Sequence, residues 1–62
     1  MKIINQELDF RGWVTFQVQS KSTDQEIKQE FQELYPQNDI AVLSYANLVD
    51  TYEVTLLPKE KL

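Results

Sequence analysis

The strongest constraint on the fold is an alternation of apolar and polar side chains in the first third of the chain. The even-numbered positions carry Ile4, Gln6, Leu8, Phe10, Gly12, Val14, Phe16 and Val18. The odd-numbered positions between them are polar except for Trp13. A period of two places alternate side chains on opposite faces of a β-strand, so the pattern predicts strands with one buried face. Arg11-Gly12 forms either a hairpin turn or a bend in one long strand, and we favour a turn between strands at 2–9 and 13–20.

The pattern changes after residue 20 to one that is typical of a helix. Thr23 followed by Glu26 three residues later is a capping-box signature, and Ser22 with Gln25 is an alternative to it. Ile27, Phe31 and Leu34 then recur at the spacing of one helix face. The residue before a proline is pushed away from helical geometry, so Tyr35-Pro36 ends the helix. We predict a helix over 24–34.

Two further strands are predicted in the last third of the chain, over 40–46 and 51–57. The second of them alternates regularly between apolar and polar side chains. The first is apolar on both faces, which is typical of a central strand with something covering each side. We expect the charged tail, 58–62, to be frayed.

The order of these elements predicts a single α+β domain over 1–62, a small ββαββ domain with a mainly antiparallel sheet and one helix packed on one face. The predicted core lies between the helix and that face. Its members are Leu8, Phe10, Val14, Phe16, Val18, Ile27, Phe31, Leu34, Tyr52, Val54 and Leu56.

Composition excludes several classes of function. The chain has 62 residues with neither His nor Cys, so disulfides, Cys/His zinc sites and cysteine or Ser-His nucleophiles are not available. We expect no catalytic activity, no metal site and no cofactor, because so short a chain seldom forms a substrate cleft. With a net charge of −4 and six basic residues, direct binding of nucleic acid is not expected. No apolar run approaches the length of a membrane span, and the absence of Cys favours a cytoplasmic location.

The first candidate site is the second face of the sheet, which one helix cannot cover. Trp13, Ala41, Leu43 and Tyr45 are expected there if Val42 faces the helix. Trp and Tyr are enriched among interface anchors, so we interpret this face as a surface for self-association or for a protein partner, with a homodimer as the leading form. The alternative is that Trp13 packs at a sheet edge and the patch is ordinary.

The second candidate site is an acidic surface on the helix and just after it, formed by Asp24, Glu26, Glu30, Glu33 and Asp39. Negative charge spaced along a helix can occupy a site that expects phosphates, as a mimic of DNA does. The alternative is a solvated helix face on which Asp24 and Glu26 complement the helix dipole.

One short segment, 49–57, resembles the first strand of the small phage-encoded inhibitors of uracil-DNA glycosylase, which are acidic and dimeric with a sheet and one helix. The likeness covers nine residues at the other end of the chain, and no functional residue is carried over. The leading hypothesis is a small acidic, non-enzymatic protein-interaction module of bacterial or phage type, forming a homodimer and binding a protein partner. The alternatives are an inhibitor occupying the nucleic-acid site of a host enzyme, and an accessory structural subunit of a larger assembly.

Overall fold

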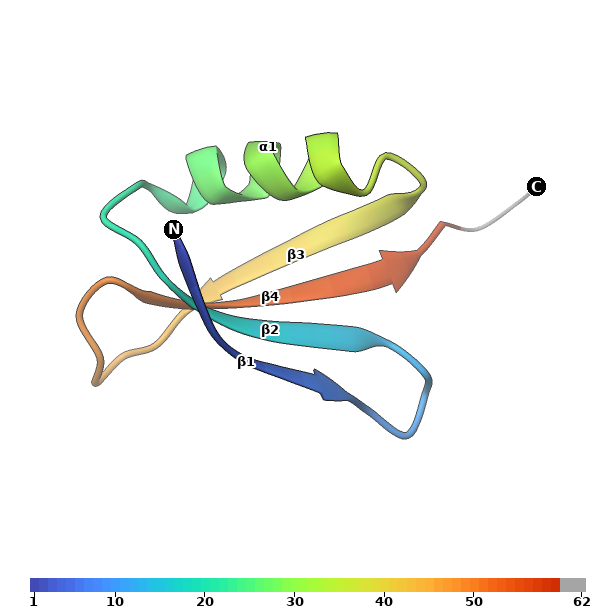
Figure 1. Ribbon diagram of the computed structural model, residues 1–62, viewed down its shortest axis with the longest axis horizontal. Coiled ribbons are helices and arrows are strands. Elements are labelled where there is room, and N and C mark those ends of the chain that lie inside the picture. The colour runs from blue at the N-terminus through green and yellow to red at the C-terminus, as the bar shows by residue number, and fades with distance from the viewer. Residues whose placement is uncertain (60–62) are drawn as a thin grey trace.

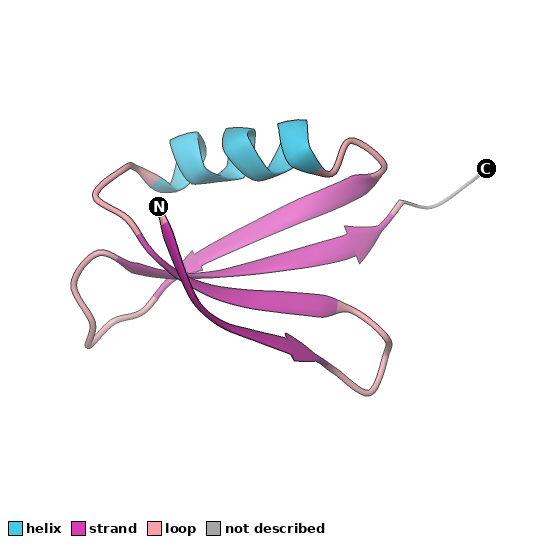
Figure 2. Cartoon of the chain, in the orientation of Figure 1, coloured by secondary structure: helices cyan, strands magenta, loops and turns pink. Residues whose placement is uncertain are grey.

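A computed structural model describes residues 1–59 as one sheet with a helix lying across it (Figures 1 and 2). The elements follow in the order β1 (Lys2–Leu8), β2 (Val14–Gln19), α1 (Asp24–Leu34), β3 (Asn38–Ser44) and β4 (Thr51–Pro58). The predicted ββαββ order and the α+β class are therefore confirmed. Pro58 is the last residue of β4 rather than part of a frayed tail, and the rest of that prediction, beyond residue 59, lies outside the described residues.

The four strands form an antiparallel sheet in the order β1-β2-β4-β3. The prediction of a central strand at 40–46 is wrong, because β3 is an edge strand. Ile40 and Val42 pair with Leu56 and Val54, the helix-side residues of β4, whereas Ala41 and Leu43 lie on the other face. One apolar side of β3 therefore packs under α1, and the other is left uncovered.

The segment between β1 and β2 is a hairpin turn, as predicted. The Gly12 N–H donates to the Asp9 carbonyl and the Asp9 N–H donates to the Trp13 carbonyl, both at 3.0 Å. Gly12 has φ +82°, a left-handed conformation that glycine adopts without steric cost. A three-residue loop that ends in such a residue is a common hairpin connection. Gly12 therefore fixes the point at which the chain reverses.

Helix α1 begins with the predicted capping box. The Glu26 N–H donates to Thr23 Oγ1 at 3.3 Å, and the Thr23 N–H donates to Glu26 Oε1 at 3.2 Å. These bonds satisfy two backbone donors that a helix start would otherwise leave without a partner. No helix within residues 1–59 is long and apolar enough to cross a membrane.

The core lies between α1 and the sheet. Its buried members are Phe16, Val18, Ile27, Phe31, Ile40, Val54 and Leu56, with Val14, Tyr35, Val42 and Tyr52 packed against them. Most of the predicted core is confirmed, and Ile40 joins it.

Three residues of the predicted core are wrong. Leu8 is 72% exposed, Phe10 is 96% exposed and Leu34 is 66% exposed. A helix is about 10–12 Å wide with its side chains, and strands are spaced about 4.8 Å apart, so one helix covers only two or three strands. Leu8 is on the edge strand β1, beyond the reach of α1, and Phe10 is at the tip of the turn. Leu34 is the last residue of α1.

Candidate functional site

The face of the sheet opposite α1, here called the open face, has no element of residues 1–59 packed on it (Figure 1). Cross-strand partners share a face, and Phe16 and Val54 define the helix side. The open face is therefore formed by the partners that alternate with them. They include Asn5, Glu7, Thr15, Gln17, Asp39, Ala41, Leu43, Glu53, Thr55 and Leu57.

The structure brings the four predicted interface residues together on this face. Trp13, Ala41 and Leu43 line one shallow hollow of about 440 Å³, whose floor includes Thr15 and Thr55. Leu43 is 63% exposed. Tyr45 lines a smaller neighbouring hollow. The predicted patch is thus one continuous surface of apolar and polar side chains.

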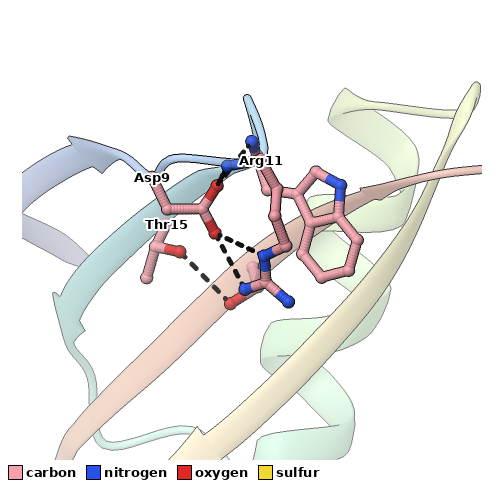
Figure 3. A network of polar contacts seen from close by, with 5 residues as sticks. Asp9, Arg11 and Thr15 are labelled. Atoms are coloured by element: carbon pink, nitrogen blue, oxygen red, sulfur yellow. Dashed lines mark hydrogen bonds and ion pairs between the residues drawn. The ribbon is translucent and has the colours of Figure 1, made fainter.

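Trp13 lines the edge of the hollow next to Asp9 and Arg11, whose contacts with each other are drawn in Figure 3. The guanidinium carbon of Arg11 lies 3.7 Å from the centroid of the Trp13 ring, which is close cation–π contact. Asp9 Oδ2 accepts hydrogen bonds from Arg11 Nη2 at 2.8 Å and from Arg11 Nε at 3.1 Å. Asp9 Oδ1 accepts from the backbone N–H groups of Arg11 at 2.8 Å and Trp13 at 3.0 Å. We call these three residues the turn cluster.

The electrostatics of the turn cluster favour an ionised Asp9. Loss of hydration, the largest single effect, acts to raise the pKa of Asp9. The N–H groups of Trp13 and Arg11 and the adjacent guanidinium act together in the opposite direction and outweigh it. The pKa of Asp9 therefore lies below its ordinary value. At neutral pH the ionised Asp9 carboxylate balances the positive charge of Arg11.

The remaining charges give the open face an acidic character. Glu7, Asp39 and Glu53 carry carboxylates on or beside this face. Two lysines also border it, Lys2 at the far corner and Lys59 in the hollow that Asp39 and Trp13 line. Among residues 1–59, the one ion pair is that between Asp9 and Arg11. A complementary surface would therefore combine apolar groups with positive charge.

The second predicted site is divided by the structure. Asp24 and Glu26 bond to backbone N–H groups at the start of α1, where acidic side chains complement the helix dipole. Glu26, Glu30 and Glu33 follow one another at i, i+4 and i+7 and so lie along one flank of the helix, exposed. Asp39 is on β3 and lies beside Trp13 at the open face, away from this row.

Sequence reasoning missed two features of the surface. The role of Arg11 depends on the turn geometry that brings it over Trp13, although the Asp-x-Arg-Gly-Trp spacing was a signal for it. The second feature is the set of exposed apolar side chains on β1 and its turn, Ile3, Ile4, Leu8 and Phe10. The sequence pattern places Leu8 and Phe10 in the core, because alternation reveals a strand but not its position in the sheet.

The described part of the chain, residues 1–59, contains no group of three or more His, Cys, Asp or Glu side chains placed to hold a metal ion. Comparisons with protein-family models, with curated proteins and with solved structures found no match for this chain.

Proposed function

We propose that this protein is a non-enzymatic interaction module that binds a protein partner on the open face of its sheet. The observation that carries the proposal is that Trp13, Ala41 and Leu43 line one shallow hollow of the open face and Tyr45 lines the hollow beside it. Trp and Tyr are the residue types most often found as binding hot spots, and Leu43 offers an exposed apolar contact beside them.

The turn cluster favours binding because its geometry is set before a partner arrives. Four hydrogen bonds to Asp9 and the stacking of Arg11 hold Trp13 at one edge of the hollow. A side chain that is already ordered loses less conformational entropy on binding than a mobile one. Trp13 is therefore the anchor that we expect to contribute most to affinity.

The charges of the open face favour a partner other than a second copy of the same face. Two copies placed face to face would bring Glu7, Asp39 and Glu53 of each chain together, and like charges in an interface oppose association. The surface that fits is an apolar one bordered by lysine or arginine side chains.

The proposal is tested by placing a photo-crosslinking amino acid at position 43 and, as a matched control, at position 30 on the exposed flank of α1. We expect a partner protein to crosslink from position 43 and not from position 30. Binding of the identified partner is then measured with Trp13→Ala, for which we expect a loss of about tenfold or more in affinity. Equal crosslinking from both positions, or unchanged affinity after Trp13→Ala, would contradict the proposal.

A second candidate function is supported by the row of Glu26, Glu30 and Glu33. Such a row can enter a groove that binds the phosphates of nucleic acid, and the protein would then act as an inhibitor of an enzyme that binds DNA. Binding by this surface should weaken steeply as the salt concentration rises, and Glu30→Lys with Glu33→Lys should abolish it.

A structural subunit of a larger assembly is the third possibility. Such a subunit should bind its neighbour through the open face, with an affinity that depends little on salt concentration.

A further inference from the structure

Strand β1 is an edge strand with every residue exposed, which sets it apart from the other three strands. Within residues 1–59, only one side of it is hydrogen-bonded, to β2, so its outer edge presents N–H and C=O groups that no described strand pairs with. Met1, Ile3 and Ile4 are about half exposed, and Leu8 and Phe10 are more exposed still. The N-terminal strand and its turn thus carry half of the large apolar side chains that residues 1–59 leave exposed.

A bulge in β1 sets which of its side chains share a face of the sheet. Ile3 pairs with Val18, Asn5 pairs with Gln17, and Ile4 is the extra residue between them. In a regular strand, residues five positions apart point to opposite faces. The extra residue reverses this alternation, so Lys2 and Glu7 both lie on the open face. On the helix side, β1 therefore carries Ile3 and Leu8 with Gln6 between them, and on the open face it carries both of its charges, Lys2 and Glu7.

The exposed apolar side chains of β1 and its turn can supply part of the area that an association buries. Met1, Ile3, Ile4, Leu8 and Phe10 together expose the equivalent of about three large side chains, roughly 500 Å² at about 150–200 Å² each. The largest patch on a typical monomer is about 300–600 Å², and stable complexes bury about 800 Å² on each partner. The backbone edge of the strand and its polar side chains supply the remainder.

The charges of β1 indicate that the molecule bound at its outer edge is a second copy of the same chain. The chain has a net charge of −4, which opposes self-association elsewhere, but β1 carries one Lys and one Glu and is balanced. Lys2 lies at one end of the strand and Glu7 near the other, so an antiparallel copy would bring opposite charges together and a parallel copy would bring like charges together. The other edge strand, β3, has only Asp39 as a charged residue, and its helix side is already covered.

We propose that two copies of this chain associate through the outer edges of their β1 strands, paired antiparallel about a two-fold axis perpendicular to the sheet. The two four-stranded sheets then form one continuous sheet. Such an axis keeps the faces of the two sheets aligned, so both copies of α1 lie on the same side. Both open faces remain free for the partner proposed above.

The test is the solution mass of the chain, measured by light scattering over a concentration series. Leu8→Lys is compared with Leu43→Lys, the same replacement at a similarly exposed leucine on the open face. We expect the wild type and Leu43→Lys to form dimers, and Leu8→Lys to raise the dimer dissociation constant about tenfold or more. Far-UV circular dichroism verifies that both variants keep their fold. A wild type that stays monomeric, or a dimer lost on Leu43→Lys and kept on Leu8→Lys, overturns the proposal.

A charge exchange tests the antiparallel arrangement. Lys2→Glu and Glu7→Lys should each weaken the dimer several-fold, and the double variant should restore it because the opposite charges again meet across the axis. A double variant as weak as the single ones excludes antiparallel pairing of β1. The dimer and the proposed partner binding can be tested independently. Leu8→Lys should leave crosslinking from position 43 unchanged, and Trp13→Ala should leave the dimer intact.

Discussion

At the residue scale, Asp9 organises the turn and one edge of the open face. Its two carboxylate oxygens accept four hydrogen bonds, two from backbone N–H groups and two from the Arg11 side chain. Asp9 thus bonds directly to the Trp13 backbone N–H, and the Arg11 side chain that it holds lies over the Trp13 ring. The conformation of a candidate binding residue thus depends on a carboxylate four positions earlier in the chain.

Asp9→Asn is expected to make stability less sensitive to acid. The pKa of Asp9 is lowered in the folded state, so its carboxylate stabilises the fold at every pH above the ordinary aspartate value of about 3.9. That stabilisation is lost as the pH falls from this value through the lower pKa of the folded protein. Urea unfolding at a series of pH values should therefore show the wild type more stable than Asp9→Asn at neutral pH, with the difference narrowing in acid. A difference that does not change with pH would contradict this account.

At the scale of elements, the start of α1 depends on a local contact that the sequence predicts. Thr23→Ala removes the side chain that accepts the Glu26 N–H, and we expect the free energy of unfolding to fall by about 1 kcal/mol. Thr23→Ser keeps a hydroxyl oxygen at the same position and should retain most of that stability. Urea denaturation of both variants measures the effect. If Thr23→Ser loses as much as Thr23→Ala, the hydroxyl does not cap the helix.

The accuracy of the sequence prediction follows from how local each signal is. Alternation, the capping box and the Tyr35-Pro36 stop are all read within a few residues. The strands and helix that they predict are present, with bounds that differ by two residues or fewer at every end. Strand order is not local. Leu8 follows the same alternation as Phe16, yet only Phe16 lies under the helix, because β1 is one strand further out.

At the scale of the whole molecule, the alternation of side chains along each strand predicts which residues of the candidate site share a face of the sheet, and nothing more. Ala41 and Leu43 were assigned to the open face because Val42 was expected to face the helix, and the register confirms that they lie on that face. The Arg11 contact with Trp13 and the bulge at Ile4 could not be predicted, since each depends on the three-dimensional path of the chain. The same holds for the edge position of β1, from which we infer the dimer.

The small size of the core makes the molecule sensitive to single substitutions within it. The described core has seven buried apolar residues, and Phe31 is in its centre, with its ring centroid 5.5 Å from that of Phe16 and 6.3 Å from that of Tyr35. A domain of this length has a total stability of about 3–9 kcal/mol, and removal of a buried Phe side chain costs about 3–5 kcal/mol. We therefore expect Phe31→Ala to leave much of the protein unfolded at 25 °C.

Leu34→Ala is the matched control on the same helix, since the sequence pattern places Leu34 on the face that carries Phe31 and the structure leaves it 66% exposed. It should lower the free energy of unfolding by less than about 1 kcal/mol, because little apolar surface leaves the core and Ala is a better helix former than Leu. Circular dichroism during urea titration distinguishes the two variants. Similar losses of unfolding free energy in both variants would mean that Leu34 is turned toward the core. The helix would then cover a different part of the sheet, and the exposure of β1 depends on that coverage.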